Sequence, residues 1–289
     1  DFGKTIQWDI PLLEGYEYEF VENVSSDPGP HHAKGIDCPQ LNKSIENWGA
    51  YAIFIFGWNY KAHLNTMKYF KGRIPVYFRG DSTLIDEKSG IKQILRRLYL
   101  TWVYKNTDYA FYVGKNNKEY FLKHGIKEEN LFFAPHAIDN ARFNDADGNY
   151  SKESTKWIKE LNIAEDKIVI LFVGKFESKK NPLILINAAK KLDSNNYHFI
   201  FVGNGVLEEE MKKESSEMTN ITFLAFQNQS KMPIVYNMAD ILALPSQGPG
   251  ETWGLVVNEA MACKKAILIS TKAGSYSDMV KNGVNGYIF

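Results

Sequence analysis

Short apolar runs alternate with polar, helix-like segments along the first half of the chain. This rhythm is typical of β-strands that alternate with α-helices, and it favours a parallel sheet. We expect strands over residues 51–56, 74–78, 109–113 and 131–134. The first half is therefore predicted to be an α/β domain.

The second half repeats the rhythm more cleanly. Its expected strands are residues 168–173, 197–202, 221–224, 241–244 and 266–270. We predict an α/β protein of two Rossmann-like doubly wound domains, in which ligands bind at the carboxyl ends of the strands. The expected domains are residues 1–140 and 166–289, and residues 141–165 form a linker with a charged helix.

Composition narrows the class of protein. The 289 residues, 44% of them hydrophobic, are enough for two domain cores, and a net charge of zero gives no sign of a nucleic-acid partner. Cys38 and Cys263 fall in different predicted domains, which fits a reducing compartment. No signal peptide opens the chain and no apolar run is long enough to span a membrane, so we expect a cytoplasmic protein.

Lysines and glycines follow two of the predicted strands in the second half. The first strand is followed by Gly174 and by Lys175 and Lys180, which suit a diphosphate as point charges, although a lysine-rich surface loop has the same composition. The second is followed by Gly203-Asn204-Gly205. This turn lacks the third glycine of a dinucleotide fingerprint, because Glu208 stands there, so we interpret it as a close backbone approach and disfavour an NAD-dependent oxidoreductase.

Two carboxylates, Glu251 and Glu259, are eight residues apart across a predicted loop-to-helix junction. We expect the helix to run from Gly254 to Ala262 and to place Glu259 two turns in. Backbone N–H groups near Trp253, Gly254 and Leu255 would then be free for a phosphate. A carboxylate accepts hydrogen bonds from sugar or ribose hydroxyls. The alternative is a solvated loop Glu and a surface helix Glu.

Together these residues resemble the donor domain of family 4 glycosyltransferases with the GT-B fold, over about residues 132–289. The resemblance implies two Rossmann-like domains that face a cleft. It rests on motifs that occur in the family's order: residues 134–139, Gly174 to Lys180, Gly203 to Gly205, residues 236–246, Glu251 to Glu259, and residues 282–289.

The resemblance also implies roles for individual residues. Lys175 and Lys180 would neutralise the donor's diphosphate, Glu251 would bind the sugar, and Glu259 the ribose. Backbone groups near Phe226 would face the base. Lys175 departs from the arginine usual in the family and forfeits its bidentate fork. Further donor contacts are implied for Gly174, Gly203, Asn204, Gly205, Gly250, Trp253, Gly254 and Leu255.

The implied reaction transfers a sugar from a nucleoside-diphosphate sugar to a hydroxyl of a carbohydrate or glycolipid acceptor, with retention of anomeric configuration. No metal and no other cofactor is expected. Catalysis would be electrostatic, because the departing nucleoside diphosphate is the charge to be stabilised. The alternative is a non-catalytic nucleotide or nucleotide-sugar binding fragment, and we expect the chain to be truncated at both ends.

Three features of the first half are less decisive. Arg79 and Asp81 follow a predicted strand and are candidates for the acceptor side, although a tight turn with an Asp cap explains them equally well. His31-His32 lies in a Pro/Gly loop without Cys or carboxylate partners at zinc spacing, so we interpret it as surface. Residues 88–102 form a basic, amphipathic helix, which fits either a contact with anionic lipid or an ordinary sheet-covering helix.

Overall fold

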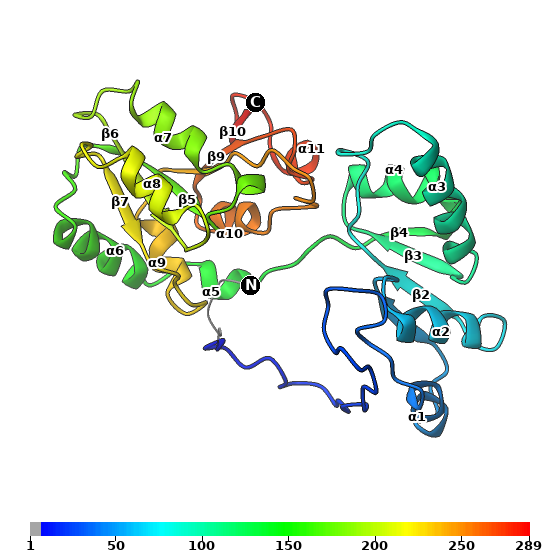
Figure 1. The fold of residues 1–289 in the computed structure, drawn as a ribbon. Helices are drawn as coiled ribbons and strands as arrows, with labels where there is room; N and C mark the ends of the chain where they lie inside the picture. The colour runs from blue at the N-terminus through cyan, green and yellow to red at the C-terminus, as the bar shows by residue number, and fades with distance from the viewer. Residues whose placement is uncertain (1–6) are drawn as a thin grey trace. The chain divides into compact units, whose positions relative to one another are not determined.

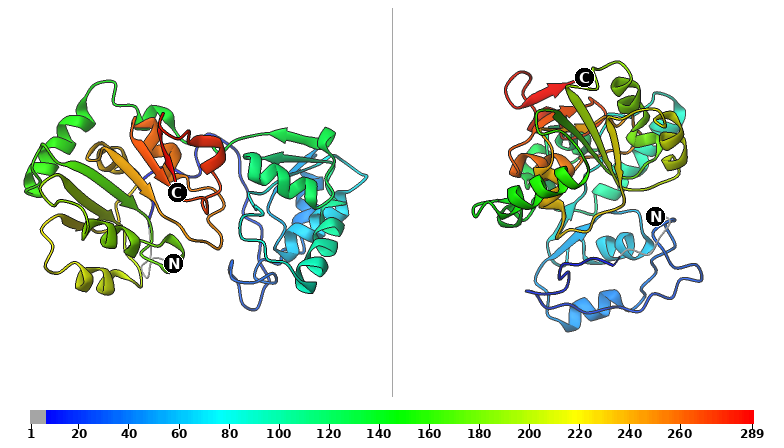
Figure 2. Two further views of the ribbon diagram at one scale, coloured as in Figure 1. Left: turned by 90° about the horizontal axis from the view of Figure 1, so that it is seen from above. Right: turned by 90° about the vertical axis from the view of Figure 1, so that its left-hand side faces the viewer.

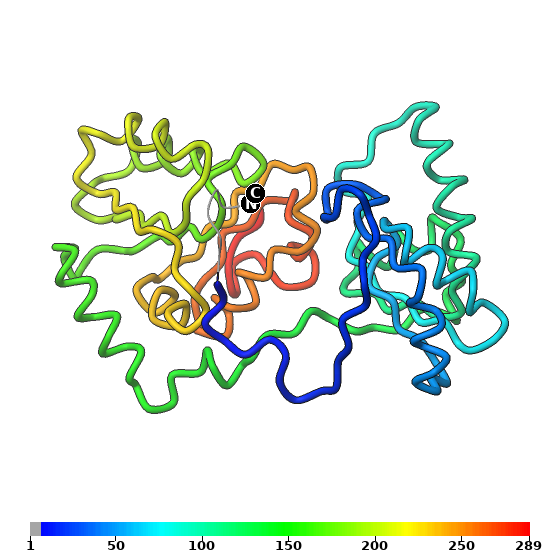
Figure 3. The backbone as a smooth tube through the Cα atoms, turned by 60° about the horizontal axis from the view of Figure 1, so that its bottom comes forward, coloured from blue at the N-terminus to red at the C-terminus, as the bar shows by residue number. Residues whose placement is uncertain are grey.

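The structure, a computed structural model, describes residues 7–289 and divides into two compact units (Figure 1). The first unit comprises Leu13–Pro135. The second unit comprises His136–Phe289 together with the described residues up to Leu12. The boundary therefore lies slightly before the predicted residue 140. Residues 7–12, which we expected in the first domain, pack with the second unit, as their blue trace in Figure 3 shows.

The first unit has a parallel sheet in the strand order β1-β2-β3-β4. Its strands are β1 (Ile53–Phe56), β2 (Val76–Arg79), β3 (Tyr109–Tyr112) and β4 (Leu131–Phe133). Its helices are α1 (Leu41–Asn47), α2 (Lys61–Phe70), α3 (Ile91–Tyr104), α4 (Lys115–Lys123) and the 3-10 turn η1 (Glu128–Asn130).

This strand order is consecutive, and right-handed crossovers then place the helices on one face of the sheet. Val76, Phe78 and Ala110 are buried on that face, whereas Phe54 and Phe132 on the other face are exposed. Within the described residues, the reversal of strand order that defines a doubly wound sheet thus occurs only in the second unit.

The second unit has a six-stranded parallel sheet in the order β10-β9-β8-β5-β6-β7. Its strands are β5 (Ile168–Val173), β6 (Tyr197–Val202), β7 (Ile221–Leu224), β8 (Ile241–Leu244), β9 (Ala266–Ile269) and β10 (Gly286–Ile288). The order reverses between β5 and β8. The carboxyl ends of these two strands are the usual place for a ligand in such a sheet.

Helices cover both faces of this sheet (Figures 1 and 2). Phe172 and Phe201 face the cluster that contains residues of α7 and α8, and Leu171 and Val202 face the cluster that contains residues of α6, α9 and α10. Trp157 of α6 joins this second cluster, so the charged helix predicted in a linker is part of the second unit. The helices are α5 (Asn140–Phe143), α6 (Asn149–Glu160), η2 (Ser178–Lys180), α7 (Leu183–Ala189), α8 (Glu208–Glu214), α9 (Met232–Asn237), α10 (Val256–Ala262) and α11 (Tyr276–Met279).

Candidate functional site

A pocket of about 280 Å³ lies at the carboxyl ends of β5, β6, β7 and β8. We call it the donor pocket. Eight of the predicted site residues line it: Gly174, Lys180, Gly203, Phe226, Glu251, Gly254, Leu255 and Glu259. The other lining residues are Trp8, Val173, Val202, Gln227, Gln229, Met232 and Val256. The pocket therefore joins residues from every strand-end motif that the sequence singled out in the second half.

Lys180 and Glu251 form an ion pair in this pocket. Glu251 is 9% exposed and Lys180 is 20% exposed, so neither charge is freely solvated. Glu251 Oε2 also accepts a hydrogen bond of 3.0 Å from Ser246 Oγ, just after β8. The pair brings one cation and one hydrogen-bond acceptor to a single point of the pocket, which is what a sugar phosphate requires.

Glu259 is held by a second polar contact. Tyr236 OH, on α9, donates a hydrogen bond of 2.5 Å to Glu259 Oε2. Burial raises the pKa of the Glu259 carboxyl, while this hydrogen bond and the nearby charge of Arg142 oppose the rise. Helix α10 begins at Val256, so Glu259 lies in its first turn and not two turns in. The late start follows from Gly254, whose φ of +91° is not helical.

The two strand-end turns after β5 and β6 are joined by backbone contacts. Gly174 N donates to Val202 O at 3.0 Å, and Phe176 N donates to Asn204 O at 2.9 Å. A Cβ at Gly203 would lie 2.0 Å from Gly174 O. The glycine-rich turn is therefore a close backbone approach, as the sequence indicated.

One family of known proteins matches the part of the chain that forms most of the donor pocket. Residues 153–289 match the family described as Glycosyl transferases group 1. We call this part the group 1 domain. It contains every lining residue of the donor pocket except Trp8.

Two relatives each match about half of the chain. The lipopolysaccharide 1,2-N-acetylglucosaminetransferase of Salmonella typhimurium is 35% identical over 141 residues, 45% of this chain and 36% of that protein. The D-inositol 3-phosphate glycosyltransferase of Salinispora tropica is 28% identical over 165 residues, 52% of this chain and 34% of that protein. The matched segments thus span about a third of the length of these curated relatives.

Solved structures match the fold over most of the chain. HepE of Anabaena, solved in complex with UDP, has a TM-score of 0.70 at 18% identity, covering 87% of this chain and 68% of that one. WaaG, a glycosyltransferase involved in lipopolysaccharide biosynthesis, has a TM-score of 0.61 at 16% identity, covering 86% and 67%. The predicted α/β class, with parallel sheets that match GT-B glycosyltransferases, is confirmed.

Five predicted donor contacts do not line the donor pocket: Lys175, Asn204, Gly205, Gly250 and Trp253. Lys175 is half-buried just after β5. Trp253 is buried, with its ring centroid 5.4 Å from that of His136. Its Nε1 donates to Asn258 Oδ1 at 2.8 Å. Its position indicates a structural role in the loop that carries Glu251.

Sequence reasoning missed the segment that supports this loop. Gly274 N donates to Glu251 O at 2.9 Å, and Ser275 Oγ donates to Trp253 O at 2.6 Å. Neither contact could be predicted from sequence spacing, because Gly274 and Ser275 follow β9 and lie more than twenty residues beyond Glu251 and Trp253. Tyr236 was noted only as part of a helix end, and its contact with Glu259 again depends on packing.

The two acceptor-side candidates, Arg79 and Asp81, belong to the first unit but do not line the same pocket. Asp81 lines a pocket of about 170 Å³ at the carboxyl ends of β1 and β2, together with Asn59 and Ser82. Arg79 does not line it, and its Nη2 donates instead to Pro135 O at 3.1 Å. At this strand end, the Asp81 carboxylate lines the pocket, whereas the Arg79 guanidinium binds a backbone carbonyl outside it.

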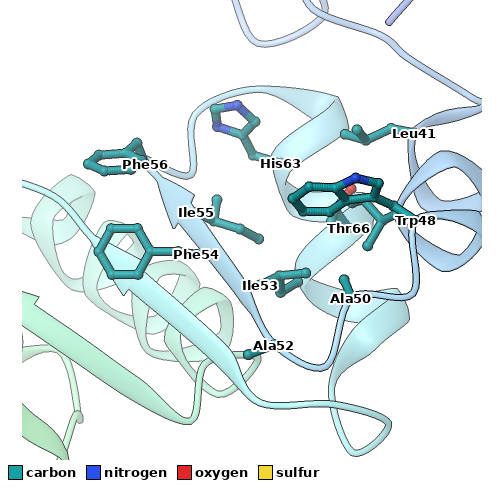
Figure 4. A pocket seen from close by; sticks show the side chains of 11 residues that line it. Leu41, Trp48, Ala50, Ala52, Ile53, Phe54, Ile55, Phe56, His63 and Thr66 are labelled. Carbon is teal, nitrogen blue, oxygen red and sulfur yellow. The ribbon is translucent and has the colours of Figure 1, made fainter. Parts of the chain in front are cut away.

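A larger pocket, of about 440 Å³, lies beside β1 (Figure 4). Its labelled side chains are mostly apolar, with His63 and Thr66 as polar members. Burial lowers the pKa of His63, so its ring is neutral at pH 7. Because it offers no charge for a phosphate, this pocket is a weaker candidate than the donor pocket despite its size.

His31 and His32 have a carboxylate neighbour, Asp27, which the sequence analysis did not identify. Asp27 Oδ2 lies 3.0 Å from His31 Nε2 and 3.2 Å from His32 Nε2. The loop folds back through four or five residues to bring the groups together, which spacing alone did not indicate. His31 and Asp27 are exposed, as expected for a surface loop.

Proposed function

We propose that the chain belongs to a retaining glycosyltransferase that moves a sugar from a nucleoside-diphosphate sugar to an acceptor hydroxyl. The observation that carries the proposal is the meeting of Lys180, Glu251 and Glu259 in one pocket at the switch point of the second sheet. The match of the group 1 domain to its family supports it.

In this proposal each charged group has a part of the donor to bind. Lys180 neutralises the diphosphate, Glu251 accepts hydrogen bonds from the sugar, and Glu259 accepts them from the ribose hydroxyls. Lys175 remains a predicted diphosphate ligand, although it does not line the pocket. Binding requires Lys180 to exchange part of its contact with Glu251 for the phosphate.

The proposed step breaks the bond between the anomeric carbon and the phosphate oxygen. The acceptor oxygen bonds to that carbon from the same face, and its proton passes to the departing nucleoside diphosphate. Positive charge from Lys180 stabilises the leaving group, and holding both reactants in one orientation lowers the entropic part of the barrier. We propose no metal and no protein nucleophile for this step.

The similar proteins suggest which donors and acceptors to test first. HepE was solved with UDP and with UDP-glucose, and the Salmonella relative is named as a lipopolysaccharide 1,2-N-acetylglucosaminetransferase. UDP-sugars are therefore the first donors, and carbohydrates or glycolipids the first acceptors. We assign the pocket of Asp81 to the acceptor side.

The first test of the proposal measures the binding of UDP, GDP, ADP, dTDP, CMP and NADH to the chain. The second measures release of the matching nucleotide from its sugar conjugate in the presence of acceptors. We expect Glu251→Gln to lower kcat/KM at least 100-fold while nucleotide Kd changes only a few-fold. Glu177→Gln is the control, because Glu177 pairs with Lys179 outside the pocket. Nucleotide binding without any sugar transfer would favour the binding fragment, and no binding at all would remove both functions.

We also propose that α3 rests on the surface of an anionic membrane, on its cytoplasmic face. Its buried residues, Leu100, Val103 and Tyr104, face the core of the first unit. An apolar stripe on the opposite side is 61% to 77% exposed at four positions: Ile91, Ile94, Leu95 and Leu98. Basic residues flank this stripe: Lys88, Lys92, Arg96 and Arg97.

This pattern fits an interfacial helix, whose apolar stripe enters the lipid while its cations meet anionic headgroups. No helix among residues 7–289 is long and apolar enough to cross a bilayer. We expect co-sedimentation with phosphatidylserine vesicles and much weaker binding to phosphatidylcholine vesicles. Ile94→Ser with Leu98→Ser should abolish it. Equal binding by that double variant would contradict the proposal.

A further inference from the structure

The short segment that precedes the first unit contributes an aromatic side chain to the donor pocket. Trp8 lines this pocket beside Phe226, and the two ring centroids are 6.3 Å apart at an interplanar angle of 71°. Trp8 lies outside residues 153–289, the part that matches the family. It is therefore a component of the pocket that the family match does not supply.

Both neighbours of Trp8 are hydrogen-bonded to the loop between β7 and α9. Asn228 Nδ2 donates to Gln7 O at 2.6 Å. Ser230 N donates to Asp9 Oδ1 at 3.2 Å, and Ser230 Oγ also donates to the Asp9 carboxylate. The hydrogen bond from Ser230 lowers the pKa of Asp9, so the carboxylate stays ionised as an acceptor near neutral pH. Contacts on either side thus hold Trp8 in place.

The position of this loop identifies the end of the pocket that Trp8 occupies. In the sheet order β8-β5-β6-β7, the strand β7 is three places from β8, which precedes Glu251. Neighbouring strands lie about 4.8 Å apart, so the loop after β8 and the loop after β7 start roughly 14 Å from one another. The donor pocket therefore extends across the sheet edge, with Glu251 and Trp8 near opposite ends.

The two ends differ in chemistry. The lining residues near β7 are uncharged, and they are Trp8, Phe226, Gln227, Gln229 and Met232. The other end holds Lys180 and Glu251, and the third charged lining residue, Glu259, is hydrogen-bonded to Tyr236 of α9. An elongated ligand with a diphosphate and sugar at the charged end would place its remaining part, a flat heteroaromatic base, against the uncharged aromatic end.

We propose that Trp8 is a binding residue for the base of the donor nucleotide. The inference rests on the proposed function, since it assigns one end of the same pocket. An indole ring offers a large flat surface to a base, and two hydrogen-bonded neighbours restrict its freedom before the ligand arrives.

The test compares Trp8→Ala and Trp8→Phe with the unaltered chain by calorimetric titration of the nucleoside diphosphate that binds best. We expect Kd to rise about tenfold in Trp8→Ala, as for loss of one base–aromatic stack, and less than threefold in Trp8→Phe. Trp48→Ala is the control, because Trp48 is exposed in the first unit. Circular dichroism and melting temperature establish that each variant is folded.

Inorganic pyrophosphate is the second probe, because it has no base. Its affinity should be the same in Trp8→Ala and the unaltered chain, so that only the base-dependent part of binding is lost. An unchanged or improved nucleotide Kd in Trp8→Ala would overturn the role of Trp8 and leave the proposed function standing. Failure of the unaltered chain to bind any nucleotide would overturn both.

Discussion

The contact between Lys180 and Glu251 makes a strong prediction for single residues. Lys180→Ala leaves Glu251 poorly solvated and without its cation, which should cost about 1–3 kcal/mol of unfolding free energy and weaken nucleotide binding at least tenfold. Lys180→Arg should recover part of both. Lys179→Ala is a matched control at the adjacent position, where a half-exposed pair is worth less than about 1 kcal/mol. Denaturant titration and nucleotide Kd measure the two effects, and equal results for both alanine variants would contradict this account.

Glu259 predicts a pH dependence of donor binding. If its carboxylate accepts the ribose hydroxyls, nucleotide affinity should fall as pH drops through its raised pKa, because the protonated carboxyl is a poorer acceptor. Tyr236→Phe removes the hydrogen bond that lowers this pKa, so the loss should begin at higher pH. In Glu259→Gln, nucleotide affinity should lose this part of its pH dependence and keep only the part that comes from titration of the nucleotide's own phosphate. A profile in Glu259→Gln identical to that of the unaltered chain would exclude the role.

At the scale of elements, five of the six strands of the second unit were predicted, whereas β10 and the loops between the strands were not. The ranges of β5 to β8 agree with the sequence prediction, because buried parallel strands are near-continuous apolar runs. The start of α10 was misplaced, because helix-forming composition does not reveal the positive φ of Gly254. The pairing of Lys180 with Glu251 was also missed, since both were assigned to ligand alone. Contacts between side chains 71 residues apart depend on strand order, which no local pattern supplies.

The segment after β9 yields a prediction for the loop that carries Glu251. A Cβ at Gly274 would lie 1.8 Å from Thr252 O, so Gly274→Ala must displace one of the two segments. We expect a loss of about 1–3 kcal/mol in stability, and nucleotide binding at least tenfold weaker. Ser277→Ala, in the same segment, should change neither by much. Unaltered nucleotide affinity in Gly274→Ala would show that the loop does not depend on this support.

At the scale of the whole molecule, the cores of the two units share no residues. We therefore expect two transitions in calorimetric unfolding, of which a nucleotide raises only that of the second unit. A ligand at 100 times its Kd adds about 2.7 kcal/mol. Leu171→Ala should lower the transition that responds to nucleotide, and Phe78→Ala the other, because each side chain is buried in one core. A single transition that both variants shift equally would contradict independent unfolding.

The division of the chain also sets an order of events during synthesis. Residues 13–135 form one compact unit, whereas Gln7 is hydrogen-bonded to Asn228, 221 residues further along. At roughly 5–20 residues per second, a ribosome needs about 10–40 seconds to cover that interval. The first unit can therefore fold before the residues that contact Trp8 and its neighbours have been synthesised. The aromatic end of the donor pocket is then assembled late, from one of its earliest-made residues.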